Sequence, residues 1–166
     1  QGAIVANRPW TPRFSPDGRR VVYGAFGEGR GTSDLWIADL EARTARRLTD
    51  DDGDANDAQW SPDGRSVAYS LLAQGGKDVM VRSLDGSEGT PLAPRPRSQF
   101  PTDWSRAARA LLVTEDGEHG GHDVLVQPAD GRAAWRFVAT PADETSARFS
   151  PDGRWVAYTS DDGGEQ

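Results

Sequence analysis

The sequence predicts an all-β chain of repeated four-stranded antiparallel units, and three observations carry this prediction. A stretch of the form aromatic-Ser-Pro-Asp-Gly-Arg begins at Phe14, Trp60 and Phe149. A worn copy begins at Trp104, so the leading aromatic residues follow one another in steps of 46, 44 and 45 residues. Between the copies lie short runs of β-branched and aromatic residues separated by Gly- and Asp-rich turns, without helical periodicity. A steady period of this size indicates a repeat architecture.

The repeated stretch predicts a strand, a tight turn and a second strand. Proline presets φ at the second turn position, Asp is tolerated at the third, and Gly takes the left-handed fourth without a Cβ clash. In the worn copy Ala108 stands where the other copies have Gly, and Arg106 where they have Pro. We therefore expect this turn to be the most strained of the four. Ala108→Gly combined with Arg106→Pro is predicted to stabilise the protein by roughly 0.4–1 kcal/mol per change.

The expected elements follow in the same order in each unit. After its turn, the first unit (about 10–55) has a second strand at 20–23, a Gly-rich connection at 24–32, and strands at 34–38 and 45–49. The second unit (about 56–99) has strands at 67–72, 78–81 and 90–92, and the third (about 100–143) at 111–114, 123–126 and 135–138. The fourth unit (144–166) reaches only its second strand. Residues 2–6 form one further short apolar strand.

Four-stranded antiparallel units at this period are the signature of a β-propeller. The second and third strands are apolar without clean alternation, as expected when neighbouring blades cover both faces. We predict one domain over 1–166, with three full blades and a partial fourth. A tandem β-sandwich is the structural rival, but sandwich domains need about 100 residues each. Two arrangements remain open: part of a larger ring, which we favour, or a four-bladed ring whose last unit is completed by residues 2–6.

Composition excludes several classes of site and partner. A net charge of -7 argues against binding to nucleic acid or to an anionic membrane surface. No apolar run approaches the roughly 20 residues of a membrane span. The absence of Cys excludes a disulfide framework, a Cys-based zinc site and a thiol nucleophile.

From about residue 10 to 161 the chain resembles the WD40-like repeats of TolB-type β-propellers. The resemblance rests on aromatic-Ser-Pro-Asp-Gly-Arg-x-Val-Ala-Tyr, seen at 149–158, and on following strands such as Asp123-Val124-Leu125-Val126. Similar repeats occur in the propellers of prolyl-oligopeptidase-like and tricorn-like proteases and in sensor regions of bacterial Ser/Thr kinases. The resemblance implies a bacterial β-propeller in a periplasmic or extracytoplasmic location. It is specific for the fold and not for a function.

Propeller topology divides the loops between two faces. The connections between second and third strands, and those between units, emerge on one face, and the Ser-Pro-Asp-Gly turns emerge on the other. Longer, variable loops are the better candidates for binding. We call the first the loop face and predict that it binds a protein or peptide, with these candidate residues: Arg30, Asp52, Asp54, Asp57, Arg95, Arg97, His119 and His122.

Two clusters on this face invite a metal hypothesis, and we reject both. Asp52, Asp54 and Asn56 have the alternate spacing of a calcium loop, but Asp57 stands where that loop needs Gly. His119 and His122 lie in a Gly-rich loop without a fixed third and fourth zinc ligand. We predict no metal site and no cofactor.

Catalytic motifs are absent from the sequence. There is no Gly-x-Ser-x-Gly elbow of a serine hydrolase and no kinase catalytic loop or ATP-binding loop. The sequence therefore predicts a non-catalytic interaction module within a larger bacterial protein, and not an enzyme. The alternatives are a substrate-gating accessory propeller of a serine peptidase and an extracytoplasmic sensor domain of a Ser/Thr kinase. An open ring would also allow a homodimer.

Overall fold

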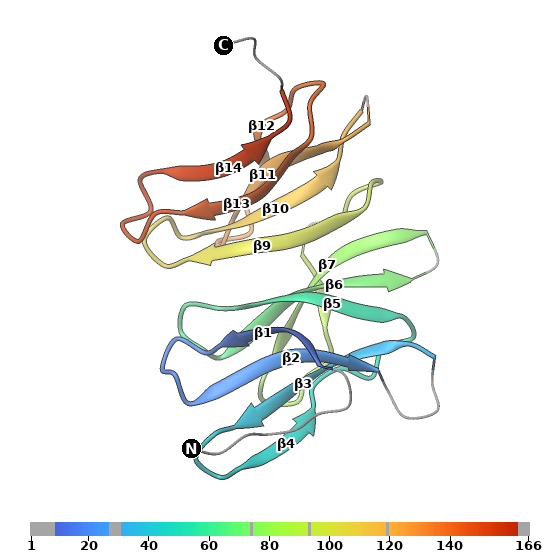
Figure 1. The fold of residues 1–166 in the computed structure, drawn as a ribbon, viewed down its shortest axis with the longest axis vertical. Coiled ribbons are helices and arrows are strands. Elements are labelled where there is room, and N and C mark those ends of the chain that lie inside the picture. Colours follow the sequence, from blue (N-terminus) through green and yellow to red (C-terminus); the bar gives the residue numbers. More distant parts are fainter. Residues whose placement is uncertain (1–8, 27–30, 74, 93, 119, 163–166) are drawn as a thin grey trace.

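The fold was analysed in a computed structural model that describes residues 9–26, 31–73, 75–92, 94–118 and 120–162. Within these ranges, fourteen strands form three four-stranded sheets and one two-stranded sheet, all antiparallel (Figure 1). Each sheet keeps the chain order of its strands, so every connection inside it is a hairpin. None of the described segments is a helix capable of crossing a membrane. The predicted all-β fold of four-stranded units is confirmed.

The strands have the following bounds. The first sheet contains β1 (Trp10–Phe14), β2 (Arg20–Phe26), β3 (Ser33–Asp39) and β4 (Thr44–Arg47). The second contains β5 (Asp54–Trp60), β6 (Ser66–Ala73), β7 (Gly76–Ser83) and β8 (Thr90–Pro91). The third contains β9 (Gln99–Ser105), β10 (Ala110–Asp116), β11 (His122–Pro128) and β12 (Trp135–Val138). The fourth contains β13 (Glu144–Phe149) and β14 (Val156–Ser160).

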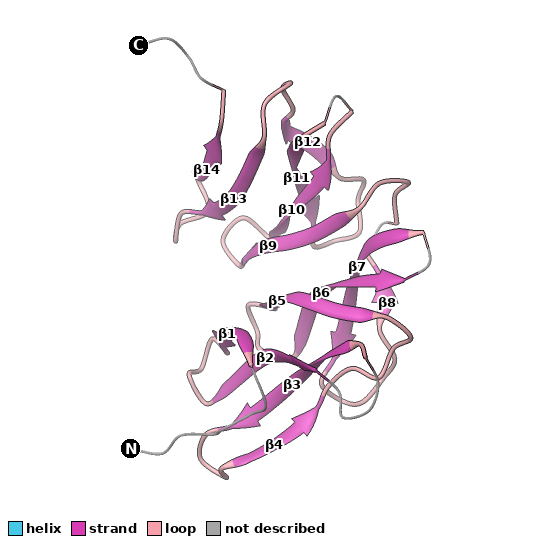
Figure 2. Cartoon of the chain, turned by 45° about the vertical axis from the view of Figure 1, so that its right-hand side comes forward, coloured by secondary structure: helices cyan, strands magenta, loops and turns pink. Residues whose placement is uncertain are grey.

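The sheets follow one another as blades of an open arc. The first strand of each sheet lies innermost, and β5 packs against β1, β9 against β5, and β13 against β9. In Figures 1 and 2 the sheet β1–β4 lies at one end of the arc and the hairpin β13–β14 at the other. Between the described strands, extensive packing joins only consecutive sheets. A closed four-bladed ring would need the last sheet to pack on the first, and residues 2–6 lie outside the described residues.

Each junction between blades has its own apolar core. Val22, Trp60 and Tyr69 belong to the core between the first and second sheets. Leu111 and Leu125 from the third sheet pack with Ala68 and Val79 from the second, and Leu112 and Val124 pack with Ala147 from the fourth. Strands β6 and β10 thus bury side chains toward two neighbouring sheets, which explains why their sequences lack a clean alternation.

Three of the four turns have the conformation that their sequence predicts. Gly18, Gly64 and Gly153 adopt φ of 69°, 69° and 70°, the left-handed region that glycine tolerates. In the first copy, the Ser15 hydroxyl donates to Asp17 at 2.5 Å, and the Gly18 N–H donates to the Ser15 carbonyl at 2.9 Å. The serine hydroxyl holds the pKa of Asp17 below its ordinary value, and the other two turns repeat this effect at Asp63 and Asp152.

The worn turn departs from the prediction. Ala108 does not adopt a positive φ; Arg109 does, at 53°. The N–H of Arg109 donates to the Arg106 carbonyl at 3.2 Å, and the N–H of Ala108 donates to the Ser105 hydroxyl at 3.1 Å. The left-handed residue is therefore displaced by one position, because without Pro and Gly nothing fixes it at 108. This turn alone among the four places a non-glycine residue in the left-handed region, as expected of the most strained turn, but that residue is Arg109 and not Ala108.

Candidate functional site

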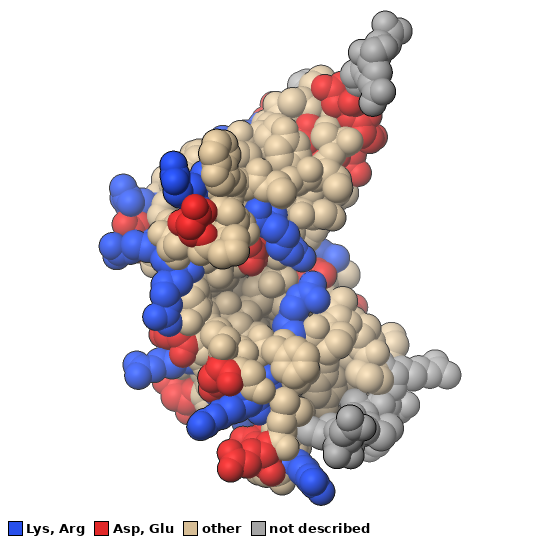
Figure 3. Space-filling model, turned by 60° about the vertical axis from the view of Figure 1, so that its left-hand side comes forward, with Lys and Arg blue, Asp and Glu red and all other residues tan. Residues whose placement is uncertain are grey.

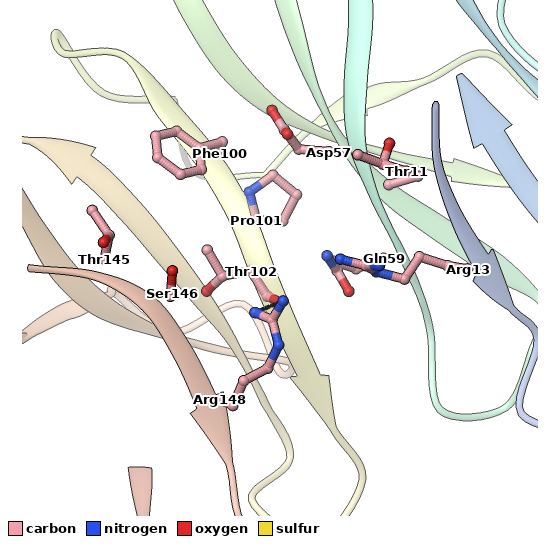
Figure 4. Close-up of a pocket in the computed structure, with 11 residues that line it drawn as sticks. Thr11, Arg13, Asp57, Gln59, Phe100, Pro101, Thr102, Thr145, Ser146 and Arg148 are labelled. Carbon is pink, nitrogen blue, oxygen red and sulfur yellow. Dashed lines mark hydrogen bonds between the residues drawn. The ribbon is translucent and has the colours of Figure 1, made fainter. Parts of the chain in front are cut away.

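The innermost strands of all four sheets enclose a hollow of about 180 Å³. Figure 3 shows a recess between the two ends of the arc, with basic side chains beside it. Figure 4 shows the side chains that line it. They come from β1, β5, β9 and β13 and are Thr11, Arg13, Asp57, Ala58, Gln59, Phe100, Pro101, Thr102, Thr145, Ser146 and Arg148.

A β-bulge at the same place in each innermost strand shapes this hollow. The pairing with the second strand shifts between Trp10 and Arg13, between Asn56 and Gln59, and between Thr145 and Arg148, and β9 shifts opposite Leu112 and Val113. The bulged residues Thr11, Asp57 and Ser146 adopt φ of 44°, 56° and 56°. Such backbone is uncommon for residues with a Cβ, and bulges redirect side chains out of the regular ladder. Among the described residues, three of the five non-glycine residues with positive φ therefore line one hollow.

Two guanidinium groups, from Arg13 and Arg148, and the carboxylate of Asp57 supply the charge of the hollow. In Figure 4, Arg13 reaches from β1 toward Gln59, and Arg148 reaches from β13 toward Thr102. Arg148 donates to the backbone carbonyls of Thr102 and Ala147, which fixes its position across the junction between β9 and β13. The lining also offers hydroxyl groups and one amide, but it contains no imidazole and no thiol. This set can bind carboxylate and carbonyl oxygens, and it lacks a nucleophile paired with a base.

A second repeated feature joins neighbouring blades at the loop face. The Ser33 N–H and hydroxyl donate to Asp54 at 2.7 and 2.8 Å, and the Lys77 N–H donates to the Ser98 hydroxyl at 3.4 Å. His122 Nδ1 lies 2.6 Å from Asp143 Oδ1. Each pair links residues 21 apart, and we call these pairs the latches. They bring the start of the third strand beside the start of the next blade, as the propeller topology predicts.

The candidate residues predicted from the sequence do not converge on one site. Asp54 and His122 belong to latches, and Asp57 lines the hollow while accepting a hydrogen bond from the Ser70 hydroxyl at 2.7 Å. Asp52 is exposed in the loop before β5. Arg95 Nε lies 2.5 Å from Glu115 Oε1, and Arg97 lies 3.2 Å from Glu118. Two further residues, Arg30 and His119, lie outside the described residues.

Arg95 belongs to a buried charge cluster beside β10, β11 and β13. Glu115, Asp123 and Glu144 are each at most 2% exposed. Arg136 lies 3.7 Å from Glu115 and 3.3 Å from Asp123. Burial raises the pKa of Asp123. The guanidinium of Arg136 lowers this pKa, and the carboxylates of Glu144 and Glu115 raise it further.

The pairing of Asp123 with Arg136 repeats at Asp34 and Arg47, which lie 3.6 Å apart in the first sheet. In the first and third sheets, the aspartate near the start of the third strand thus forms an ion pair with the outer strand of its own blade. Over the described residues, no group of three or more His, Asp and Glu side chains is arranged to hold a metal ion.

Sequence reasoning missed the hollow. Its residues stand at the same place in each repeat, two to five residues before the serine of the next turn, but their side chains differ. For example, Thr11, Asp57, Pro101 and Ser146 occupy the equivalent position. The repeat spacing could have aligned them. Nothing in these residue types predicts a bulge, because Thr, Asp and Ser are all compatible with a regular strand edge.

No family model matches the chain. It is 30% identical over 165 residues to the uncharacterized peptidase YuxL of Bacillus subtilis, covering 92% of this chain and 23% of that protein. It is 29% identical over 147 residues to a TolB homologue of Chlorobium chlorochromatii, covering 86% of this chain and 33% of that protein. The crystal structure of TolB from Acinetobacter baumannii superimposes with a TM-score of 0.81 at 18% identity, over 96% of this chain and 39% of that one.

The chain thus spans 23% and 33% of the length of these two curated relatives. The sequence repeats, the four-stranded blades and the match to TolB proteins agree with one another. The repeats and blades of this chain are similar to those of TolB-like β-propellers, and the described sheets form an open arc of such a propeller.

Proposed function

We propose that this chain is a non-catalytic interaction segment of a larger bacterial protein and that its hollow binds a carboxylate-bearing segment of a protein or peptide. The observation that carries the proposal is the convergence of four bulged strands on one recess that holds Arg13 and Arg148. Backbone held in sparsely populated conformations often marks a binding site. Arginine is the side chain best suited to recognise a carboxylate.

The size of the hollow supports a peptide over a small molecule. Pockets for small ligands usually measure about 300–1,000 Å³, whereas this hollow measures about 180 Å³. It suits one acidic side chain or the end of a peptide. The net charge of -7 disfavours a nucleic-acid partner. The loop-face surface remains a prediction; its described candidate residues, apart from Asp52, already have partners within the chain.

A peptide display selection tests the proposal without assuming a partner sequence. A random library is selected on the 166-residue chain, and the enriched peptides are titrated against Arg13→Gln/Arg148→Gln. We expect Asp- and Glu-bearing peptides whose affinity falls at least tenfold in this variant. Arg19→Gln/Arg154→Gln is the matched control. It removes two exposed arginines that follow the Ser-Pro-Asp-Gly turns on the face opposite the loop face, and it should change the affinity less than twofold. Equal binding by the hollow variant and the parent would refute the proposal.

The similarity to YuxL, which is named as a peptidase, favours a second candidate function. In that case the propeller positions substrate for a catalytic domain elsewhere in the polypeptide. Peptide hydrolysis by the complete protein, measured with and without Arg13→Gln/Arg148→Gln, distinguishes the two functions. Hydrolysis that depends on the arginines supports the accessory role, and binding without hydrolysis supports the interaction module.

A further inference from the structure

A groove lies on the outer side of the junction between the first and second sheets. Its volume is about 270 Å³, against about 180 Å³ for the hollow, and the two share no lining residue. Both sheets have four strands, so complete blades bound the groove on either side. Its lining comes from β4, the connection to β5, the end of β7 and the turn after β7, and consists of Arg46, Arg47, Leu48, Thr49, Asp50, Arg82, Ser83 and Gly86.

Arg82 is the buried guanidinium of the groove. It is 7% exposed, and its Nε and Nη1 donate to the carbonyls of Ser87 and Leu48 at 3.1 and 2.9 Å. Its Nη2 donates to Asp50 at 3.2 Å, and Asp51 lies 3.7 Å from Nη1. A guanidinium has five N–H groups, so these three hydrogen bonds leave Arg82 with capacity for a further acceptor.

Arg46 supplies a charge that no neighbouring carboxylate offsets. It is exposed, and its Nη2 donates to the Leu84 carbonyl at 3.3 Å, so the side chain reaches from the first sheet to the second. Arg47 lies 3.6 Å from Asp34, and Arg82 likewise has carboxylates beside it. In the part of the chain that the structure describes, no carboxylate lies within ion-pair distance of Arg46.

The next junction shows that the fold does not require these two arginines. Thr90 has in the second sheet the register that Arg46 has in the first. Gln127 has in the third sheet the register that Arg82 has in the second, and like Arg82 it donates to a carbonyl of the turn that follows its strand. Neutral side chains therefore serve at both positions between the second and third sheets, and the charge is particular to the groove.

The charge and size of the groove indicate the chemistry of its ligand. Three arginines and one aspartate line it, in a chain whose net charge is -7. A phosphate ester carries nearly two negative charges at pH 7 and three acceptor oxygens, so it matches two guanidinium groups, whereas a carboxylate carries one charge. The volume of about 270 Å³ lies just below the range of about 300–1,000 Å³ usual for small-molecule pockets, which suits a compact anionic group.

We propose that the groove binds a phosphate group through Arg46 and Arg82. Arg46 contributes from the outer strand of one blade and Arg82 from the third strand of the next, and Arg47 adds positive charge beside them. A bound phosphate therefore joins the two blades and stabilises the folded chain by mass action. Its source is the free ion or a phosphate ester, which present the same oxygens. This site is separate from the hollow and does not depend on the function proposed there.

Isothermal titration calorimetry with inorganic phosphate and with glycerol 3-phosphate tests the proposal on the 166-residue chain. We expect saturable binding of at least one probe. Tighter binding of glycerol 3-phosphate assigns the site to an ester, and equal or weaker binding of it assigns the site to the free ion. Acetate, the probe for a carboxylate, should bind at least tenfold more weakly than phosphate.

Three variants locate the bound phosphate. Arg46→Gln removes the charge that no carboxylate offsets and should weaken binding at least fivefold. Arg82→Gln, which copies Gln127 of the third sheet, should also weaken binding, with circular dichroism as the check that it folds. Arg65→Gln removes an exposed arginine of the second sheet outside the groove and is the matched control, so its affinity should stay within twofold of the parent.

Four results would overturn the proposal. They are the absence of saturable phosphate binding, and an equal loss of affinity in Arg46→Gln and Arg65→Gln. Acetate binding as tight as that of phosphate would assign the groove to an acidic side chain of a partner protein. Loss of phosphate binding in Arg13→Gln/Arg148→Gln, with parent affinity in Arg46→Gln, would place the phosphate in the hollow.

Discussion

Replacing Arg109 by glycine is expected to stabilise the worn turn, whereas replacing Ala108 by glycine is not. Arg109 holds φ of 53°, and left-handed backbone costs a residue with a Cβ about 1–2 kcal/mol. Glycine removes that cost but adds about 0.4–1 kcal/mol of unfolded-state entropy. From the centres of these two ranges, the net gain for Arg109→Gly is about 0.8 kcal/mol.

Ala108→Gly adds the same entropy and relieves no strain. Its cost is about 0.4–1 kcal/mol, because the left-handed residue lies elsewhere. Combining it with Arg106→Pro also removes the hydrogen bond from Arg106 to the Pro62 carbonyl at 2.7 Å, which joins this turn to the preceding one. The double variant that the sequence pattern favours should thus be less stable than the parent.

Thermal unfolding followed by circular dichroism decides between the two positions. For a chain of this length, 1 kcal/mol corresponds to a Tm shift of about 2–4 °C. We expect Arg109→Gly to melt above the parent and Ala108→Gly to melt below it, with urea unfolding giving the same order. A higher Tm for Ala108→Gly than for Arg109→Gly would refute the assignment of the strained residue.

Three further predictions test the packing between blades and its charge. Gly153→Ala should destabilise the protein by at least about 1 kcal/mol more than Gly18→Ala in urea unfolding. Both glycines have φ near 70°. However, a Cβ at Gly153 would lie 2.5 Å from the backbone nitrogen of Ala108, whereas a Cβ at Gly18 would have no atom within contact distance. Trp60→Phe should lower the free energy of unfolding by about 1 kcal/mol, because the indole N–H donates to a carbonyl of the first sheet at 2.9 Å, while Trp155→Phe at a 71% exposed position should have little effect in the same assay. The pKa of Asp123 is raised above its ordinary value of 3.8, so the folded state favours the protonated form of this carboxyl. The free energy of unfolding of the parent, measured relative to that of Asp123→Asn, should therefore rise as the pH falls from the raised pKa toward 3.8. A difference between these two proteins that stays constant across that pH series would contradict the burial of the charged form.

The turns and strands could be predicted because their causes are local. Pro16, Asp17 and Gly18 each set one position of a turn, and the same chemistry recurs in two more copies. The prediction for the worn turn was wrong in position because no residue of that turn imposes a conformation locally. Aligning Ala108 with the glycines of the other turns assumed a left-handed conformation that Ala108 does not adopt. In the absence of Pro and Gly, packing against the turn at Gly153 and the bond to Pro62 determine where the left-handed residue falls.

The candidate site could not be predicted because its causes are not local. The bulges at Thr11, Asp57 and Ser146 are a property of four strands converging on one axis, and the residues share no side-chain chemistry. Asp54 and His122 are conspicuous in the sequence because they are polar, but each contacts a residue of the adjacent blade or strand start.

The latches have a consequence for how such a protein can change in length. Every latch joins residues 21 apart, although its chemistry differs: serine to aspartate, backbone to serine, and histidine to aspartate. Each of the three latches joins the start of a third strand to the start of the next blade, so none of them spans more than one junction between blades. Duplicating or deleting a whole blade leaves the latches at the other junctions intact, as in other proteins whose units interact only with nearest neighbours. The latches therefore specify how one blade packs on the next, whereas the number of blades is determined by the geometry of the whole ring.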